Sequence, residues 1–443
     1  MIKADYLVIG SGPIGVFATK YLLEKNKSVV LIDNSKKKNF SNHSNLNLKK
    51  IESHSFVYDF QNSATKKNKE VLPISSKSAG GFTKVWGGTL NPIDDSEVSK
   101  LGIDLNVYKR KYKVLLETIP NYELNEYLDN FKTTTGQNIK LSAPILSTKK
   151  GSESFWSSEV LLNELLNSHK ERIKYIDNVD VKNIIKENND YKIITDEIEL
   201  HFDVKKIFVC SGSFSSSQIA SRMIEAKNFT ISDSQLQVWP IFYFGKKFKK
   251  ENNKFNSFDN EAYSKLMINV WNHSSSIKCQ LYEINKESIF EIKKRLPIIS
   301  IPIVALLRVF SKRIFLLFVY KDSEHSKYSL FKLRDNKKTE LLKTIKPNNK
   351  ISLLKFIGNF LEKKLLIIPF QYPFISYGSF HHGNLCVIKD GNKIYLDEFG
   401  QISKYENIHF VDSTAMKFIP SGPFTISSII YSQVLLDKIF YEK

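Results

Sequence analysis

The sequence predicts an α/β fold, in which a parallel sheet with helices is joined to an α+β region built on an antiparallel sheet. The stretch "DYLVIGSGPIGVFATKYLLEKNKSVVLID" (5–33) has the order of a buried strand, a glycine turn, a helix and a second strand. A later stretch, "KKIFVCSGSFSSSQIASRM" (205–223), repeats the strand, the small-residue turn and the start of a helix. Three segments, 265–275, 277–285 and 313–322, are typical of adjacent antiparallel strands.

The first stretch indicates a site for a dinucleotide. A strand over 5–9 and a helix over 16–24 flank a GxGxxG turn, which consists of Gly10, Gly12 and Gly15. Glycines allow a tight turn and the close approach of a pyrophosphate to the helix N-terminus. Asp33 follows the second strand (29–32), where a carboxylate accepts hydrogen bonds from a ribose. The segment 205–223 is expected to return to the same sheet, beside this turn.

Composition limits the classes of protein. The 443 residues are 42% hydrophobic and 12% aromatic, enough for a large core and two or three domains. The net charge of +19 suggests nucleic acid, but only seven of the 65 basic residues are arginines and the lysines are scattered in polar segments. We therefore expect no nucleic-acid partner. Polar segments at 34–50, 62–70, 245–257 and 335–350 are predicted to be loops.

Cysteine usage and the N-terminus indicate the compartment. Cys210, Cys279 and Cys386 are far apart and form no CxxC pattern, which predicts neither a disulfide framework nor a structural metal site. The opening "MIKADYLVIG" enters a strand at once, without a basic region followed by an apolar one. The expected location is cytoplasmic.

A second glycine-rich segment, "SAGGFTKVWGGTLNP" (78–92), combines four glycines and two threonines with one tryptophan. Backbone without a Cβ approaches a ligand closely, so this segment predicts a loop that lies against an extended ligand. At this point the chain resembles the glucose–methanol–choline (GMC) family of FAD-dependent oxidoreductases, of the compact bacterial type. Five blocks carry the resemblance in the family's order: "GSGPIG", "GGFTKVWGGTLNP", "IFVCSGSFSSSQI", "SFHHGN" and "NIHFVDSTAMKFIPSGPFTISSII".

The resemblance implies a Rossmann-like FAD-binding domain formed by residues 1–100, 171–225 and 385–443. It implies a substrate-binding domain formed by 101–170 and 226–384. The FAD is expected to be noncovalent, because Val85 stands where some relatives carry a histidine that links to the flavin.

The residues that the resemblance places around FAD come from every block, and Val181 matches the position whose backbone pairs with adenine. They are Gly10, Gly12, Pro13, Gly15, Asp33, Gly80, Gly81, Thr83, Trp86, Gly87, Gly88, Val181, Ser211, Gly212, Asp412, Pro423 and Phe424. Pro423 suits the start of a long helix predicted over 425–440. The resemblance implies that the N-terminus of that helix faces the flavin, where it would stabilise negative charge on the reduced ring.

The stretch "SFHHGN" (379–384) supplies the expected catalytic residues His381, His382 and Asn384. Two adjacent histidines are by themselves as consistent with turn or core residues as with catalysis. The resemblance implies that His381 takes the hydroxyl proton while hydride leaves the alcohol carbon for flavin N5. No second cluster with ligand spacing accompanies the pair, so no metal is expected.

One position departs from the family. Gly422 stands where members carry a second His or Asn that binds the substrate hydroxyl. The residues considered for that role are Asn384, Tyr377, Ser421 and His325. This glycine leaves open a degenerate protein that binds FAD without alcohol oxidation. An NAD-dependent sugar-modifying enzyme, which needs only the first glycine turn, also remains open.

The expected activity is oxidation of an alcohol by FAD, with a small sugar, polyol or glycan-pathway intermediate as substrate and an unknown electron acceptor. In the middle of the chain, Trp271, Tyr282 and Tyr320 are predicted to be core residues, with substrate stacking as the alternative. The apolar run 296–320 contains Arg308 and Lys312, four residues apart. These charges argue against a membrane span and allow peripheral contact with an anionic membrane.

Overall fold

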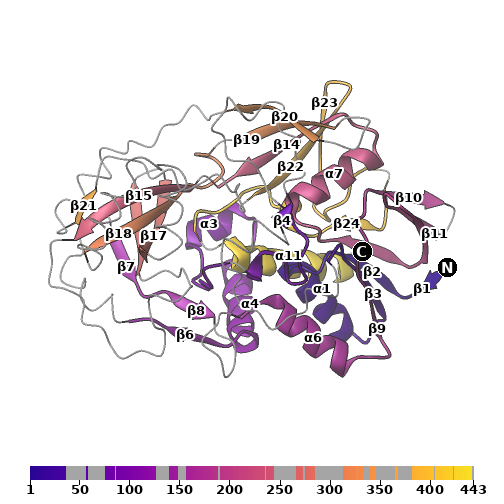
Figure 1. The fold of residues 1–443 in the computed structure, drawn as a ribbon, viewed down its shortest axis with the longest axis horizontal. Helices are drawn as coiled ribbons and strands as arrows, with labels where there is room; N and C mark the ends of the chain where they lie inside the picture. Colours follow the sequence, from indigo (N-terminus) through magenta and orange to yellow (C-terminus); the bar gives the residue numbers. More distant parts are fainter. Residues whose placement is uncertain are drawn as a thin grey trace, which may run out of the picture.

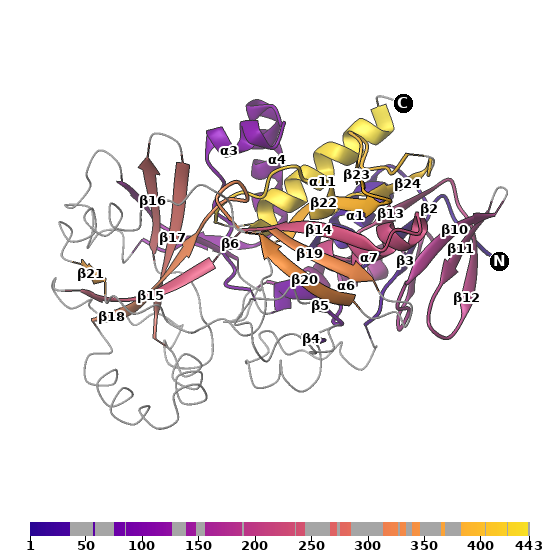
Figure 2. The same ribbon diagram turned by 90° about the horizontal axis from the view of Figure 1, so that it is seen from above.

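The computed structural model describes residues 1–35, 56–57, 75–84, 86–125, 139–147, 156–187, 190–234, 236–243, 266–272, 275–284, 313–326, 328–333, 339–345, 365–367, 382–403, 405–422 and 424–441. In Figure 1 a parallel sheet lies at one end of the molecule and an antiparallel sheet at the other. A third, five-stranded sheet runs along one side between them, as Figure 2 also shows. The expected α/β fold is confirmed.

The parallel sheet is made of strands that are far apart in the chain. Its order is β24 (Ile408–Phe410), β13 (Lys206–Val209), β2 (Tyr6–Ile9), β3 (Val29–Ile32) and β9 (Ile173–Ile176). All four residues of β2 and of β3 are buried, as expected for a sheet covered on both faces. The predicted return of 205–223 to this sheet is confirmed, because β13 pairs in parallel with β2.

Three helices pack together against this sheet: α1 (Pro13–Glu24), α6 (Ser158–Ser168) and α11 (Phe424–Tyr441). Aromatic contacts join the last helix to the first strands, since the Phe440 ring lies 5.5 Å from Tyr6 and 6.3 Å from Phe208. The two ends of the chain are thereby brought into one core. The helix predicted over 425–440 is confirmed.

A small sheet adjoins the parallel one, in the order β1 (Ile2–Lys3), β12 (Glu199–Asp203), β11 (Asp190–Ile194) and β10 (Asn183–Glu187). The five-stranded sheet has the order β20 (Thr339–Ile345), β19 (Tyr328–Leu333), β14 (Asn228–Asp233), β22 (His382–Lys389) and β23 (Asn392–Tyr395). It packs on α7 (Ser213–Met223). The rings of Phe214, Phe229 and Phe331 make this contact, 5.3–6.0 Å apart.

The five-stranded sheet corrects one expectation. The polar segment 335–350 was predicted to be a loop, but 339–345 forms the edge strand β20. Pairing with β19 satisfies the backbone groups on one side of β20, and Gln218 on α7 donates to the buried Thr339 hydroxyl at 2.7 Å. A partner strand therefore overrides a weak local preference.

The six-stranded antiparallel sheet has the order β21 (Leu365–Ile367), β15 (Leu236–Tyr243), β18 (Ile314–Tyr320), β17 (Ser275–Glu283), β16 (Leu266–Asn272) and β7 (Ile139–Ser142). The three adjacent strands expected here are confirmed. One face forms a separate apolar core around Cys279, Leu281 and Leu317. Along β17 the alternate residues Lys278 and Gln280 belong to the other face, where both are buried.

The aromatic residues predicted in this region are core residues where they are described. Tyr282 and Tyr320 are buried, and both hydroxyls donate to Gln280 Oε1, at 2.8 and 3.2 Å. The side chain of Trp271 lies outside the described residues. A contribution of either tyrosine to substrate binding stays a prediction.

Short elements connect the sheets. They are β4 (Phe56–Val57), β5 (Ser75–Ser76), η2 (Gly81–Lys84), α3 (Asp95–Lys100), α4 (Leu105–Thr118), β6 (Asn121–Glu123), β8 (Ile145–Ser147) and η4 (Ser413–Ala415). Asp104 caps α4 by accepting from the N–H groups of Asn106 and Val107, both at 3.0 Å.

Cys210, Cys279 and Cys386 are buried free thiols.

Within the described ranges, no helix is both long and apolar enough to cross a membrane. The C-terminal part of the run 296–320 is β18, an interior strand of the six-stranded sheet. Residues 296–312 lie outside the described residues. Contact with an anionic membrane through this run stays a prediction.

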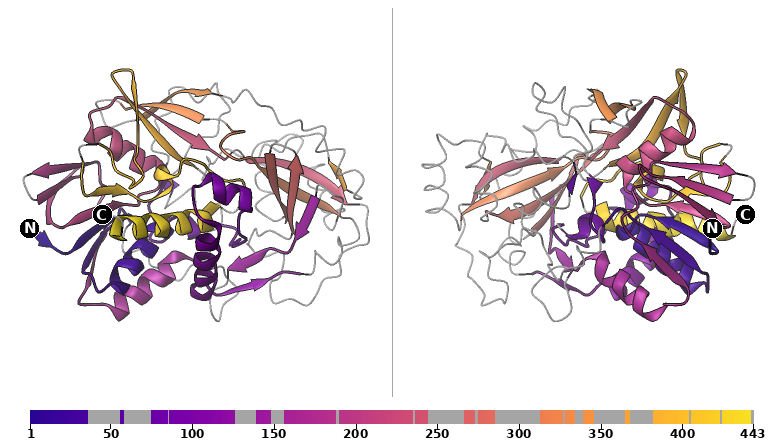
Figure 3. Two further views of the ribbon diagram at one scale, coloured as in Figure 1. Left: turned by 180° about the vertical axis from the view of Figure 1, so that it is seen from behind. Right: turned by 45° about the vertical axis from the view of Figure 1, so that its right-hand side comes forward.

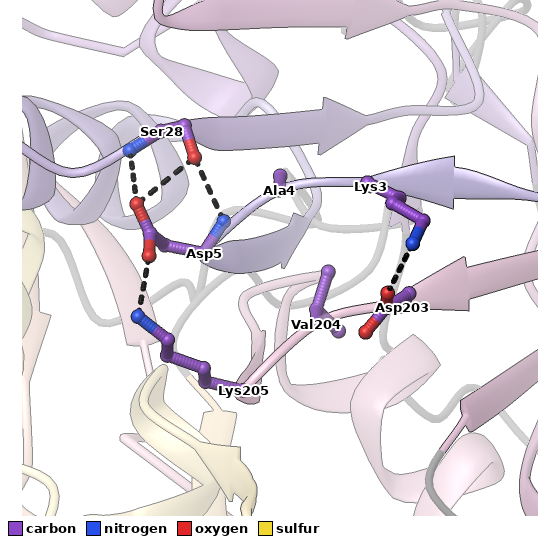
Figure 4. Close-up of a pocket in the computed structure, with 7 residues that line it drawn as sticks. All are labelled: Lys3, Ala4, Asp5, Ser28, Asp203, Val204 and Lys205. Carbon is purple, nitrogen blue, oxygen red and sulfur yellow. Dashed lines mark hydrogen bonds and ion pairs between the residues drawn. The ribbon is translucent and has the colours of Figure 1, made fainter.

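A pocket of about 400 Å³ lies at the amino ends of β2, β3 and β13 (Figure 4). It is lined by Lys3, Ala4, Asp5, Ser28, Asp203, Val204 and Lys205. Its charges are paired, with Lys205 Nζ 2.7 Å from Asp5 Oδ1 and Lys3 Nζ 3.2 Å from Asp203 Oδ2. Asp5 Oδ2 also accepts from the Ser28 N–H and hydroxyl, both at 2.9 Å. The arrangement joins three strand ends.

Asp5→Asn is expected to lower the free energy of unfolding at neutral pH by about 1 kcal/mol, since the pair is open to solvent. The Lys205 hydrogen bond and those from Ser28 lower the pKa of Asp5 to about 2. A depressed carboxyl pKa stabilises the fold above its unfolded value near ~4, and this contribution disappears between pH 4 and pH 2. Urea unfolding of both proteins across this range measures it. A difference that does not shrink as the pH falls from 4 to 2 would contradict the assignment.

Candidate cofactor and catalytic site

The first glycine turn follows β2 and has two kinds of glycine. Gly10 has φ +103°, and a Cβ there would lie 2.4 Å from the Cys210 carbonyl oxygen. A Cβ at Gly15 would lie 1.8 Å from the Gly10 oxygen. Gly12 is different, since no described atom lies within 4 Å of its Cβ position. Packing therefore requires Gly10 and Gly15, whereas Gly12 faces open space at the N-terminus of α1, which begins at Pro13.

The second glycine loop lies directly on the first. The Gly80 N–H donates to the Ser11 carbonyl at 3.0 Å, and a Cβ on Gly81 would lie 3.1 Å from Gly12 Cα. Gly80 and Gly81 have positive φ, as has Gly88, whose carbonyl accepts from the Ser147 N–H at 2.7 Å. The two segments therefore border the same open space. Gly87 is half-buried beside Gly88, and Val85 lies outside the described residues.

The start of α6 holds this loop in place. Thr83 Oγ1 accepts from the Ser158 N–H at 3.0 Å, and the Ser158 hydroxyl donates to the Gly80 carbonyl at 3.0 Å. A buried ion pair of 2.6 Å joins Lys84 Nζ to Glu159 Oε2. Sequence reasoning missed Ser158 and Glu159. Their signal is the polar "SSE" before the apolar run at a helix start.

An aromatic contact fixes the other end of the same loop. Trp86 Nε1 donates to the Trp156 carbonyl at 2.9 Å, and the two rings lie 6.3 Å apart. Trp86 thus has a described structural role, in addition to the cofactor contact expected from the sequence.

The third turn follows β13 and meets the C-terminal block. Gly212, with φ +81°, precedes α7, and the buried Asp412 lies just beyond β24. Asp412 accepts from the Ser216 hydroxyl at 2.5 Å and from the Thr414 N–H at 3.0 Å. Burial raises the pKa of Asp412, while these hydrogen bonds and one from the Gly212 N–H lower it. Gly10, Gly212 and Asp412 therefore meet at the carboxyl edge of the parallel sheet.

Asp33 lies at the end of β3 and is almost fully buried. Its two carboxylate oxygens accept from the N–H groups of Ser11 at 2.7 Å and Ser35 at 2.8 Å. Burial raises the pKa of Asp33, and these backbone donors lower it. The Asp33 carbonyl accepts from the Val179 N–H at 2.8 Å, which brings the segment containing Val181 to this edge. Val181 itself precedes β10.

The end of "SFHHGN" lies against the C-terminal block. In β22, a Cβ on Gly383 would lie 2.3 Å from the Ser413 oxygen and 2.4 Å from Ile419 Cδ1. Asn384 follows with φ +52°, where asparagine is tolerated better than most residues. His382 pairs with Asp233 through the strand backbone. His381, Pro423 and the side chain of His382 lie outside the described residues, and Phe424 begins α11.

Gly422 has φ +90°, and a Cβ there would lie 2.7 Å from Lys278 Cδ. The Lys278 ammonium lies 2.6 Å from Glu97 Oε2. Glu97 Oε1 accepts from the Ser421 N–H at 2.7 Å and from its hydroxyl at 2.8 Å. Sequence reasoning missed Lys278 and Glu97, because a lysine in the apolar stretch "IKCQLY" shows no ligand or partner in its own neighbourhood.

His325, another residue considered beside Gly422, follows β18. Its Nδ1 lies 2.7 Å from Asp322 Oδ1, and the neighbouring Ser323 exchanges two hydrogen bonds of 2.9 Å with the Ile419 backbone. Ligand atoms of Asp322, Glu324 and His325 lie within 4.8 Å of one another. Glu324 pairs with Lys100, and His325 already uses Nδ1 for Asp322. Tyr377 lies outside the described residues.

Comparison with known proteins gives one kind of match. No family model matches the sequence, and no curated protein matches it. Among solved structures, the chain is similar to pyridoxine 4-oxidase from Mesorbium loti, with a TM-score of 0.62 and 11% sequence identity. The match covers 99% of each chain. The chain therefore shares the fold of that protein over its whole length.

Proposed function

We propose that this chain is an FAD-dependent oxidoreductase of the GMC type that oxidises an alcohol group of a small molecule. One observation carries the proposal: two glycine-rich turns, the Gly212 turn, the Asp412 loop and the start of β22 all converge at the carboxyl edge of one parallel sheet. Ligands of open α/β sheets bind at this edge. The shared fold with a protein named as an oxidase of pyridoxine, an alcohol, supports the same class of activity.

The described residues fit FAD. Gly12 leaves open space at a helix N-terminus, where backbone N–H groups bind a pyrophosphate. The hydroxyl oxygens of Ser78 and Ser211 are buried and lack a hydrogen-bond partner among the described residues. An orphaned buried hydroxyl costs about 1–3 kcal/mol, which a polar ligand would offset. Asp33 and the segment around Val181 would hold the adenosine end. Gly80, Gly81, Thr83, Gly87, Gly88 and Asp412 would line the flavin end.

The proposed reaction assigns a role to FAD, to the adjacent histidines His381 and His382, and to the N-terminus of α11. When bound, FAD accepts the hydride that leaves the alcohol carbon. His381 would take the hydroxyl proton, with His382 and Asn384 beside it. The N-terminus of α11, which begins at Phe424, would favour negative charge at the cofactor, and Pro423 precedes it in the sequence. The proposed binding is noncovalent, with Val85 at the position of a linking histidine.

The partners in this proposal are a small alcohol and an electron acceptor of unspecified chemistry. A sugar or a polyol is the preferred alcohol. Nucleic acid is not proposed as a partner. We keep the division into an FAD-binding domain (1–100, 171–225, 385–443) and a substrate-binding domain (101–170, 226–384) as part of the proposal. The five-stranded sheet takes strands from both, because β22 crosses residue 384.

The visible spectrum of the purified protein tests this function, followed by anaerobic addition of sugars, polyols and pyridoxine. We expect a flavin spectrum that at least one alcohol bleaches. A flavin spectrum that no alcohol bleaches would favour a degenerate FAD-binding protein. A colourless protein that FAD does not reconstitute, but that binds NAD, would replace the proposal with a nicotinamide-dependent enzyme.

A further inference from the structure

Lys278 is a buried cation at the boundary between the six-stranded sheet and the rest of the molecule. Its side chain is 1% exposed and projects from β17. The ammonium lies 2.6 Å from Glu97 Oε2 and 3.6 Å from Asp94 Oδ2. Both acids belong to the start of α3, which lies between this sheet and the N-terminal end of α11 in Figure 3. The ion pair therefore links elements that are distant in sequence.

Glu97 connects Lys278 to the turn that precedes α11. One carboxylate oxygen binds Lys278, and the other accepts both the N–H and the hydroxyl of Ser421. Glu97 and Ser421 are buried, at 2% and 0% exposure. A buried carboxylate with a cation on one oxygen and two donors on the other has a defined orientation. Ser421 is thereby held at a fixed position relative to β17.

The carbon chain of Lys278 also fills space. A Cβ on Gly422 would lie 2.7 Å from Lys278 Cδ and 3.3 Å from its Cβ. The φ of +90° at Gly422 already favours glycine. A side chain at 422 is thus excluded by Lys278 as well as by the backbone.

We propose that Lys278 is a positioning residue of the candidate site. Its ammonium, acting through Glu97, holds the Ser421–Gly422 turn at the N-terminus of α11, and its carbon chain occupies the volume that a side chain at 422 would need. The positioning part of this inference rests on the proposed function.

The steric part is tested on the protein without cofactor, by thermal unfolding. Gly422→Ala is compared with Gly391→Ala, since Gly391 has φ +80° and no described atom within 4 Å of its Cβ position. We expect Gly422→Ala to lower Tm by about 1–3 °C more than the control. The excess should disappear in a Lys278→Ala/Glu97→Gln background, which removes both the carbon chain and the buried charge. Equal losses at the two glycines in wild type would already overturn the steric claim.

The positioning part is tested on the FAD-loaded protein with Lys278→Met/Glu97→Gln, a pair of similar shape without charges. We expect a shifted flavin absorption band and midpoint potential, with alcohol-dependent flavin reduction slower by ~10-fold or more at saturating substrate. Lys278→Arg, which keeps the cation, should restore the spectrum and the potential. A lower Tm with an unchanged spectrum, potential and rate would reduce the pair to a structural cross-link.

The two failures are distinguishable. Wild-type protein that binds no FAD would refute the proposed function and, with it, the positioning role. The thermal comparison of Gly422 and Gly391 needs no cofactor, so it would still decide whether Lys278 excludes a side chain at 422.

Discussion

Gly12→Val is expected to yield folded protein that has lost FAD. Gly12 has extended backbone, with φ −64° and ψ 177°, which valine adopts easily, and its Cβ position meets no described atom within 4 Å. The fold should therefore tolerate the substitution, with Tm within a few degrees of wild type. A ligand approaching the N-terminus of α1 would meet the new methyl groups, so FAD affinity should fall by at least ~100-fold. Fluorescence titration of FAD and thermal unfolding measure the two effects.

Gly15→Val is the matched control for this prediction. Its Cβ would lie 1.8 Å from the Gly10 carbonyl oxygen, inside the contact between α1 and the end of β2. This variant should lose the fold itself and not only the cofactor, because backbone cannot yield there without separating strand and helix. Normal FAD content in Gly12→Val would refute the cofactor placement. Normal Tm in Gly15→Val would refute the packing argument.

His381→Ala is expected to slow alcohol-dependent flavin reduction by ~10²–10⁴-fold, the range for removal of a general base. FAD should remain bound, since no glycine turn is altered. Anaerobic stopped-flow absorbance at saturating alcohol measures the rate, and the flavin spectrum reports the cofactor. His201→Ala, at an exposed position of β12, is the control and should behave as wild type. Unchanged reduction by His381→Ala would remove it from the proposed mechanism.

Local sequence predicted the elements whose signals are local. The strand, turn, helix and strand of residues 5–33 form as expected, because buried apolar runs and glycines at fixed spacing satisfy hydrophobic and backbone requirements within about 30 residues. The three antiparallel strands 266–272, 275–283 and 314–320 were also predicted, from the residue pattern within each segment. The segment 339–345 was not, since only its pairing with β19 makes a polar stretch into a strand.

The candidate site divides in the same way. Glycine spacing and the five blocks predicted the turns at Gly10, Gly80 and Gly212 from the sequence alone. They also indicated that position 422 lacks a side chain. They did not indicate what occupies that space, nor that Ser158 and Glu159 fix the second loop. The sequence shows that Gly422 lacks a side chain, whereas only the three-dimensional structure shows that Lys278 fills the space.

The sequence by itself determined the order of the elements, the glycine turns and the region of the chain proposed to form the site. Only the tertiary structure decided that Lys278 lies on Gly422 and that Glu97 holds Ser421. Lys278 and Glu97 are 181 positions apart in the chain, and Glu97 and Ser421 are 324 positions apart. Contacts over such separations leave no periodicity or motif in the chain, because their free energy arises from burial and charge pairing that exist only after the sheets have packed.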